Sequence, residues 1–263
     1  MREAHVKGAS KDEINHLIRE YNERCNPVFP IPEERHVYWA NSFSHPKLEV
    51  FHLVDNQMIS EEMEWSLIPF WCKDEAVANK VRRGTYNARS ETMFDKPSFR
   101  ASAKTRRGVI LVESFYEYHQ YEKKKYPFNI RSKDGEPIYL AVLWDEWTNK
   151  DSGEIIKSFA IVTVKGNPVM GVIHNGTRDG EPRMPLILSD TAQLSVWLAR
   201  GGYENYTYKE VLDICQSSPE IHYTYTPVAK LMGNGGSGNS PRAIEAHDYP
   251  ELANDVELQT VLQ

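Results

Sequence analysis

Cysteine is scarce in this sequence, with Cys25, Cys72 and Cys215 the three among 263 residues. An odd number of cysteines at irregular spacing predicts neither a disulfide framework nor a zinc site. We therefore expect a reduced, cytoplasmic protein with no bound metal and no cofactor.

Long hydrophobic runs are also missing, since no stretch reaches the roughly 18 apolar residues that span a bilayer. The first ten residues, MREAHVKGAS, lack the apolar core of a secretory signal. We expect neither a membrane partner nor a leader. Excess positive charge is absent as well, because the net charge is −6. A nucleic-acid binder of this composition needs a local basic groove.

Apolar residues make up 40% of the chain, which is enough for a packed core. A capping box at 10–13 (SKDE) with apolar residues at helical spacing after it predicts a helix over 11–24. Further helices are expected from Ser189 and from a second capping box at 207–210. Strands are expected at 49–54, 58–65, 138–144, 159–164 and 186–188, with one long strand from Gly108 through Tyr118. Residues 72–106 are polar and irregular.

Strands dominate the middle of the chain and helices lie at both ends. This order predicts an α+β fold: a single domain with a mainly antiparallel, barrel-like β-sheet core flanked by helices. We expect the domain to span 1–234. Residues 235–263 are expected to be a flexible Gly/Ser-rich segment and an acidic tail, which either wraps the surface or stays disordered. Nothing in the sequence demands an oligomer, so we expect a monomer.

Two polar or aromatic segments in the first half of the chain suggest chemistry. Residues 65–71 (WSLIPFW) place two tryptophans around a proline, which fits either core packing or a platform for an unpaired base. Residues 87–92 (NARSET) fit either a solvated loop or a contact with DNA. In the second case Arg89 binds a phosphate bidentately, and Asn87 offers both a donor and an acceptor.

Two titratable residues suggest proton transfer. Glu117 lies among aromatic residues in a strand, and enclosure there raises the pKa of a carboxyl toward neutral pH. His174 lies in a glycine-containing loop just before a strand, where functional residues often occur. Taken alone, a strand carboxylate usually faces water and a lone histidine is more often structural.

The order of these segments is more specific than any one of them. The chain reads WSLIPFW, NARSET, RRGVILVESFYEY, FAIVTVKG and IHN followed by RMPLIL. In this order it resembles the SOS-response-associated peptidase (SRAP) family over residues 10–234. The matching family segments read close to WGLIPxW, NARxE, GFYEW, IVT and HxRMP.

The resemblance implies a protein that recognises abasic sites in single-stranded DNA and traps them as covalent crosslinks. In the family, a cysteine exposed after loss of the first methionine supplies both an amine and a thiol. The amine forms an imine with the aldehyde of the open sugar, and the thiol then closes a thiazolidine ring. The peptidase label refers to the proposed self-removal of that methionine.

Carried over by position, Glu117 matches the acid–base glutamate, and His174 matches the histidine that assists sugar opening and contacts the adjacent phosphate. Asn87 matches the asparagine that positions nucleophile and sugar. The resemblance also assigns DNA contacts to Arg89 and Thr163, an aromatic wall to Trp65 and Trp71, and the groove edge to Arg183 and Met184.

The sequence departs from the family at the nucleophile, because Arg2 stands where the cysteine belongs. Either the start is misassigned, or the chain is altered, or this member binds abasic DNA reversibly. The three cysteines are internal and cannot supply an amine and a thiol from one residue. Cys72 follows Trp71 but is expected to be a buried small side chain. The amine of Met1 alone can still form an imine, which favours strand cleavage over a stable ring.

Two other functions stay open. One is a non-covalent binder of single-stranded DNA with a relic site, whose binding is salt-sensitive and leaves no crosslink. The other is a peptidase acting on other proteins, although no Ser/His/Asp or Cys/His pattern supports it.

Overall fold

The computed structural model describes residues 37–177, 180–199, 208–216 and 223–262, together with Asp12, His16, Arg19 and Glu23. The helix expected over 11–24 therefore lies largely outside the described residues; the four isolated ones are helical and exposed. Cys25 and Arg2 also lie outside them.

Five strands close into a small barrel, which confirms the α+β fold with a barrel-like core. These strands are β1 (Lys47–Val54), β2 (Gln57–Trp65), β4 (Arg107–Val112), β7 (Ile138–Thr148) and β8 (Ile155–Lys165). They pair in the order β2-β1-β4-β7-β8, and β8 returns to β2 through a short parallel pairing. The other barrel pairs are antiparallel.

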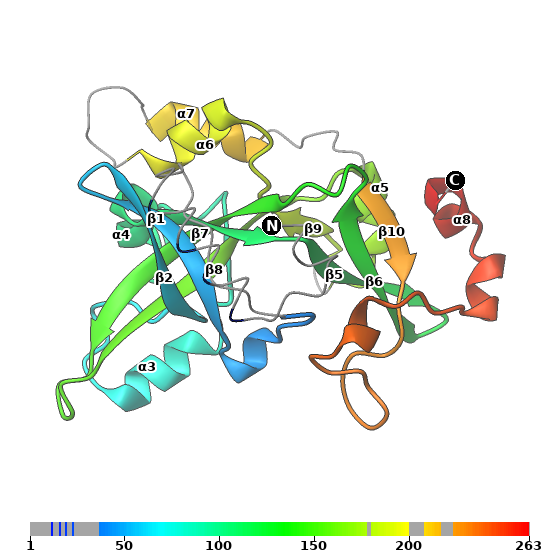
Figure 1. Ribbon diagram of the computed structural model, residues 1–263, viewed down its shortest axis with the longest axis horizontal. Helices are drawn as coiled ribbons and strands as arrows, with labels where there is room; N and C mark the ends of the chain where they lie inside the picture. Colours follow the sequence, from blue (N-terminus) through cyan, green and yellow to red (C-terminus); the bar gives the residue numbers. More distant parts are fainter. Residues whose placement is uncertain are drawn as a thin grey trace.

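Two short strands extend the barrel on either edge of β8. Strand β3 (Asn87–Arg89) runs parallel to β8, and β9 (Arg183–Pro185) runs antiparallel to it. A separate three-stranded sheet, in the order β10-β6-β5, lies beside the barrel in Figure 1. It consists of β5 (Ser114–Tyr121), β6 (Lys124–Ser132) and β10 (Tyr223–Pro227).

Helices cover the outside of this framework. Helices α6 (Thr191–Leu198) and α7 (Tyr208–Gln216) pack together on one side of the barrel, and α3 (Glu75–Arg82) lies on the opposite side (Figure 1). The remaining helices of the described segments from residue 37 onward are α4 (Arg100–Thr105), α5 (Pro168–Ile173) and α8 (Val256–Leu262), with short 3-10 turns η1 (Ser42–Ser44), η2 (Pro241–Ile244) and η3 (Pro250–Asn254). No helix in the described part of the chain is both long and apolar enough to span a membrane.

Tight turns explain two of the hairpins. Asp55 and Asn56 join β1 to β2 with φ angles of 49° and 63°, and Glu122 and Lys123 join β5 to β6 with 46° and 65°. Two consecutive positive φ angles are typical of the two-residue turn that matches strand twist. At Gly108 of β4, an added Cβ would lie 2.9 Å from the backbone oxygen of Phe51 on β1, so this crossing requires glycine.

The structure corrects four expectations about elements. Residues 72–106 are not irregular throughout, because they contain α3, β3 and α4. The long strand from Gly108 to Tyr118 is wrong, because the chain leaves the barrel at Glu113 and enters the second sheet as β5. The strand expected at 186–188 occurs three residues earlier, as β9. The helix expected from Ser189 begins at Thr191, where Asp190 accepts a hydrogen bond from the backbone of Gln193.

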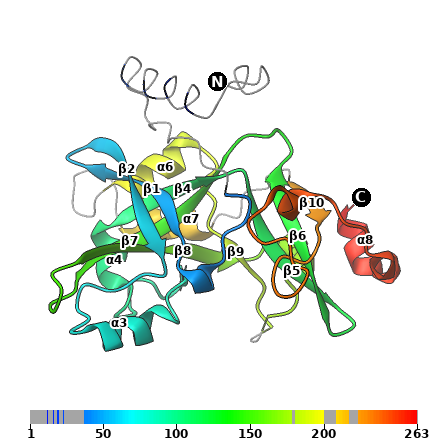
Figure 2. The same ribbon diagram turned by 60° about the horizontal axis from the view of Figure 1, so that its bottom comes forward.

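The C-terminal segment packs on the domain, so of the two alternatives for the tail the structure has the wrapped one. The backbone of Gly236 and Ser237 folds back onto Gly233 and Lys230 by hydrogen bonds. Leu252 and Leu258 are buried in the same core as the barrel. Figure 2 shows this segment running along the second sheet to α8.

Replacing Leu258 with alanine tests how firmly the tail is anchored. Leu258 has no exposed surface, so the change should lower the free energy of unfolding by about 3 kcal/mol through lost burial and a cavity. The control is Val256→Ala on the same helix, where 79% of the residue is exposed and the change should stay within about 0.5 kcal/mol. Equal denaturant midpoints for the two variants would mean that α8 is not docked in solution.

Candidate active site

Glu117 and His174 meet between the second sheet and the end of α5. Glu117 lies on β5, and its Oε2 is 3.3 Å from Nδ1 of His174, the residue that ends α5. The side chains are 19% and 27% exposed, so both are partly enclosed but open on one side. The structure thus brings together two of the three residues that the sequence assigns to catalysis.

The orientation of His174 is set by the backbone around it. Its backbone N–H donates to Met170 in the last turn of α5, and its Nδ1 lies 2.9 Å from the carbonyl oxygen of Arg183 on β9. A carbonyl oxygen only accepts, so Nδ1 carries the hydrogen. Nε2 is then the nitrogen that can exchange a proton with a bound substrate.

A double hydrogen bond that the sequence did not predict holds the loop after His174. The side chain of Asn175 accepts from the backbone N–H of Gln120 at 2.8 Å and donates to its carbonyl oxygen at 3.0 Å. Since β5 is the edge strand of its sheet, this amide pairs with the free edge as a further strand would. The pairing fixes His174 beside Glu117.

Glu117 has the titration behaviour expected of an acid–base group. Burial raises the pKa of its carboxyl to about 8, because the charged form loses hydration. Only a charged imidazole at His174 would oppose this rise in the pKa of Glu117. The hydrogen on Nδ1 of His174 is directed to the carbonyl oxygen of Arg183, which is nearer to Nδ1 than the Glu117 carboxyl is. At pH 7 Glu117 is therefore mainly protonated and able to donate a proton.

Asn87 and Arg89 lie on the far edge of β8 from His174. Both are exposed on one face of β3, where Asn87 pairs in register with Ile161, and Arg89 with Thr163. Thr163 in turn pairs with Pro185 of β9, the strand that accepts the hydrogen bond of His174. Asn87 is thus separated from His174 by β8 and β9, at the other end of this strip of three strands.

Arg183 and Met184 are not placed as the groove edge that was expected. Arg183 is 8% exposed, and its guanidinium binds both oxygens of Glu91, at 3.0 and 2.8 Å, and the carbonyl oxygen of Thr163 at 2.7 Å. Met184 is 1% exposed. Arg183 therefore ties β9 to the loop after β3, and Met184 is part of the core, so neither offers its side chain to a DNA strand.

The two tryptophans have different environments. Trp65 is partly buried, stacks on Phe159 with ring centroids 6.2 Å apart, and donates from Nε1 to the carbonyl oxygen of Tyr86. Trp71 is 42% exposed, and Phe70 beside it is 55% exposed. Of the expected aromatic wall, Trp71 presents a surface to solvent and Trp65 is largely structural. Phe70 was not singled out from the sequence, although its place between Pro69 and Trp71 was a signal.

The two cysteines that the structure describes are not nucleophiles at neutral pH. Cys72 and Cys215 are buried, and burial raises their thiol pKa values to about 11 and about 12. Neither is a thiolate at neutral pH. Among the described residues, no group of three or more His, Cys, Asp or Glu side chains is placed to hold a metal ion.

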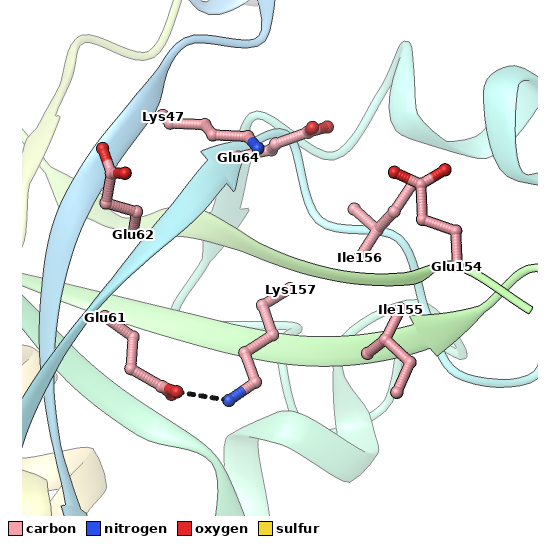
Figure 3. Close-up of a pocket in the computed structure, with 8 residues that line it drawn as sticks. All are labelled: Lys47, Glu61, Glu62, Glu64, Glu154, Ile155, Ile156 and Lys157. Carbon is pink, nitrogen blue, oxygen red and sulfur yellow. Dashed lines mark hydrogen bonds and ion pairs between the residues drawn. The ribbon is translucent and has the colours of Figure 1, made fainter.

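A surface hollow elsewhere on the described part of the molecule has the wrong charge for DNA. Figure 3 shows this space of about 430 Å³, where Glu61 on β2 pairs with Lys157 on β8 at 2.5 Å. Three further carboxylates line it, from Glu62, Glu64 and Glu154. The excess of negative charge would repel a phosphate backbone, and the hollow contains none of the expected site residues.

Comparison with known proteins fixes the family of this chain. A family model described as SOS response associated peptidase (SRAP) matches residues 8–235. The chain belongs to the SRAP family. Abasic site processing protein YoqW of Bacillus subtilis (strain 168) is 33% identical over 187 residues, which cover 71% of this chain and 76% of that protein.

Other SRAP comparisons extend this result. Abasic site processing protein HMCES of Xenopus tropicalis is 28% identical over 209 residues, covering 73% of this chain and 58% of that protein. A crystal structure of a Bacteroides thetaiotaomicron protein has the same fold, with a TM-score of 0.71 and 24% identity over 89% of this chain and 96% of its own. A Bordetella bronchiseptica structure gives 0.60 and 25%, over 70% and 84%.

The SRAP match ends at residue 235, before the wrapped C-terminal segment. That segment nevertheless reaches the site: Asp255 lies 2.9 Å from Nε2 of His119, two residues after Glu117 on β5. This contact is a feature of the present chain outside the part that defines the family.

Proposed function

We propose that this chain processes abasic sites in single-stranded DNA, with Glu117 as the acid–base group and His174 as its partner. The contact between these two side chains, with the pKa of Glu117 at about 8, carries the proposal. A general acid works best when its pKa is near the pH at which it operates. The relatives YoqW and HMCES, both named abasic site processing proteins, support the same substrate.

The aldehyde of an open abasic sugar matches this chemistry. A neutral amine forms a bond to the aldehyde carbon, and the oxygen leaves as water once it has received a proton. Glu117, protonated at pH 7, supplies that proton and later takes one back when the product forms. Nε2 of a neutral His174 accepts a hydrogen bond from the sugar hydroxyl, and once it carries a proton it donates to the adjacent phosphate.

The strip of strands next to this pair supports a single-stranded path. Asn87 and Arg89 are exposed on one face of β3, whereas Thr163, the partner of Arg89 on β8, is 8% exposed and is not expected to contact DNA as the resemblance implied. Exposed Phe70 and Trp71 offer faces on which unpaired bases stack, at about 1–3 kcal/mol per base. Stacking on protein requires bases that are not already paired, which favours single strands.

The covalent step depends on the residue at position 2. With cysteine as the first residue, its thiol sulfur bonds to the imine carbon and its proton passes to the nitrogen, which closes a thiazolidine ring. With an N-terminal residue that supplies only an amine, the imine returns to aldehyde or leads to strand cleavage. The second candidate is a form that binds abasic DNA reversibly, without a crosslink.

A crosslinking assay tests the proposal. The chain as printed and an Arg2→Cys variant, with loss of Met1 checked by intact mass, are incubated with a labelled single-stranded oligonucleotide containing one abasic site. On a denaturing gel we expect a stable shifted band from Arg2→Cys, and a band from the printed chain only after borohydride reduction of the imine. The matched controls are the same oligonucleotide with an intact base and its duplex.

The outcomes separate the candidates. Preferential binding of the abasic oligonucleotide without any band from Arg2→Cys would support the second candidate, a reversible binder of abasic DNA. Equal binding of abasic and intact oligonucleotides, with no band, would overturn the proposed substrate.

A further inference from the structure

His119 is a buried histidine whose two ring nitrogens both face acceptors. It lies on β5, is 1% exposed, and its Nδ1 is 2.9 Å from the carbonyl oxygen of Val172 on α5. Its Nε2 is 2.9 Å from Oδ2 of Asp255. A carbonyl and a carboxylate both accept, so the ring satisfies both partners when each nitrogen carries a hydrogen.

These contacts belong to a larger attachment between α5 and β5. Val172 is held by His119, His174 contacts Glu117, and Asn175 pairs with Gln120. On each segment these residues lie within four positions of one another: His174 lies between Val172 and Asn175, and Glu117 lies two residues before His119 on β5. The His119 contact therefore helps to set the position of His174 relative to Glu117.

Asp255 is itself rigidly held. Its Oδ1 accepts a hydrogen bond from the backbone N–H of Leu258 at 2.9 Å, which caps the start of α8. Its other oxygen is thereby aimed at His119. Leu252 and Leu258 anchor the surrounding turns in the core, and α8 packs directly on α5.

We propose that Asp255 is a positioning residue that, acting through His119, holds the end of α5 so that His174 stays against Glu117. The proposal rests on the proposed function for its effect on catalysis, but the contact itself is independent of any substrate. Loss of the Asp255 carboxylate leaves a buried ring nitrogen without its acceptor, which is an unfavourable state. We expect the His119 ring to rotate in response, which breaks its hydrogen bond to the carbonyl oxygen of Val172.

Three variants of the full-length chain isolate this effect. Asp255→Ala removes both the cap and the partner of His119. Asp255→Asn keeps both, because its oxygen caps α8 and its N–H group donates to Nε2 of a neutral His119. Asp190→Ala is the matched control, since it removes an aspartate that caps a helix in the same way but on α6, away from β5.

Two measurements are made on each variant. The first is amide hydrogen exchange of Gln120 and His174, whose N–H groups donate to Asn175 and Met170. We expect about tenfold faster exchange in Asp255→Ala, near wild-type exchange in Asp255→Asn, and no local change in Asp190→Ala. The second compares the crosslinking rate constant, in the Arg2→Cys background, with the Kd for the abasic oligonucleotide. In Asp255→Ala the rate should fall about tenfold while Kd stays within about twofold.

The results separate failure of this proposal from failure of the proposed function. Wild-type exchange at Gln120 and His174 in Asp255→Ala would overturn the positioning role, whatever the DNA assay gives. An equal loss of rate in Asp190→Ala would also overturn it, because general destabilisation would then explain the effect. Faster exchange without any reaction on abasic DNA in the parent protein would uphold the contact and reject only the proposed function.

Discussion

A Glu117→Gln variant is expected to be more stable than the parent protein at pH 9, by up to about 5 kcal/mol, and similar to it at pH 4. The reason is the buried carboxyl, whose pKa is raised from 4.5 to about 8 in the folded chain. Glutamine keeps an oxygen acceptor for His174 but cannot ionise. The measurement is urea denaturation of both proteins across this pH range.

The sign follows from proton binding. Between pH 4.5 and about 8 the folded chain retains a proton that the unfolded chain has lost, so the free energy of unfolding falls as the pH rises. Below pH 4.5 both states hold the proton, and the stability from Glu117 is fully present. The control Glu113→Gln, at a carboxylate that is 83% exposed, should keep the parent's pH dependence. If Glu117→Gln also keeps it, the carboxyl is not buried in solution.

The same substitution should slow the reaction with abasic DNA by about 10²- to 10⁴-fold at pH 7, the usual contribution of a general acid–base group. This loss would accompany a gain in stability at high pH, so it would not arise from unfolding. A variant that is both more stable and inactive would show that Glu117 serves the reaction although its carboxyl lowers the stability of the fold at high pH.

An Arg183→Met variant is expected to lose about 2–3 kcal/mol of unfolding free energy, the usual contribution of hydrogen bonds to a charged group. The guanidinium is nearly buried and joins Glu91 to the backbone of Thr163, across three segments of chain. Methionine fills part of the space but supplies no donors. Thermal or urea unfolding gives the measurement.

The matched control is Arg131→Met, which removes an ion pair to Glu113 whose partners are 43% and 83% exposed. An exposed pair of this kind contributes about 0–1 kcal/mol. A loss at Arg183 no greater than that at Arg131 would contradict the buried network. The side chain of Arg183 would then again be a candidate for contact with DNA.

The sequence predicts best where local patterning and structure agree. The β1–β2 hairpin and strands β7 and β8 follow from segments rich in apolar and β-branched residues, and the structure confirms them with shifts at their ends. Helix α3 was missed because its eight residues lie within a stretch that is polar overall, although Val77, Ala78 and Val81 pack on a small core cluster and Asp74 caps the first turn. The break at Glu113 was invisible because β4 before it and the aromatic-rich start of β5 after it are both typical of strands.

For the site, the residue types were predictable and their contacts were not. Glu117 among aromatics indicated a raised pKa, and the structure agrees. The family resemblance assigned Arg183 to the groove edge, but its side chain binds Glu91, 92 positions away in sequence, which the sequence did not reveal. Asn175 and Asp255 were not predicted from the sequence. Their partners, Gln120 and His119, are far from them along the chain, so both contacts depend on the fold alone.

The distance along the chain between His119 and Asp255, 136 residues, has a consequence for synthesis. A ribosome adding about 5–20 residues per second needs roughly 7–27 s to make that stretch. In the later part of this interval, once α5 has been made, β5 and α5 both exist, while the acceptor for the buried imidazole is still to be synthesised. We expect the barrel to fold first during synthesis. The contact between Glu117 and His174 reaches its final geometry only after the C-terminal segment has left the ribosome. Translation that stops early then yields a folded product in which this pair is misaligned.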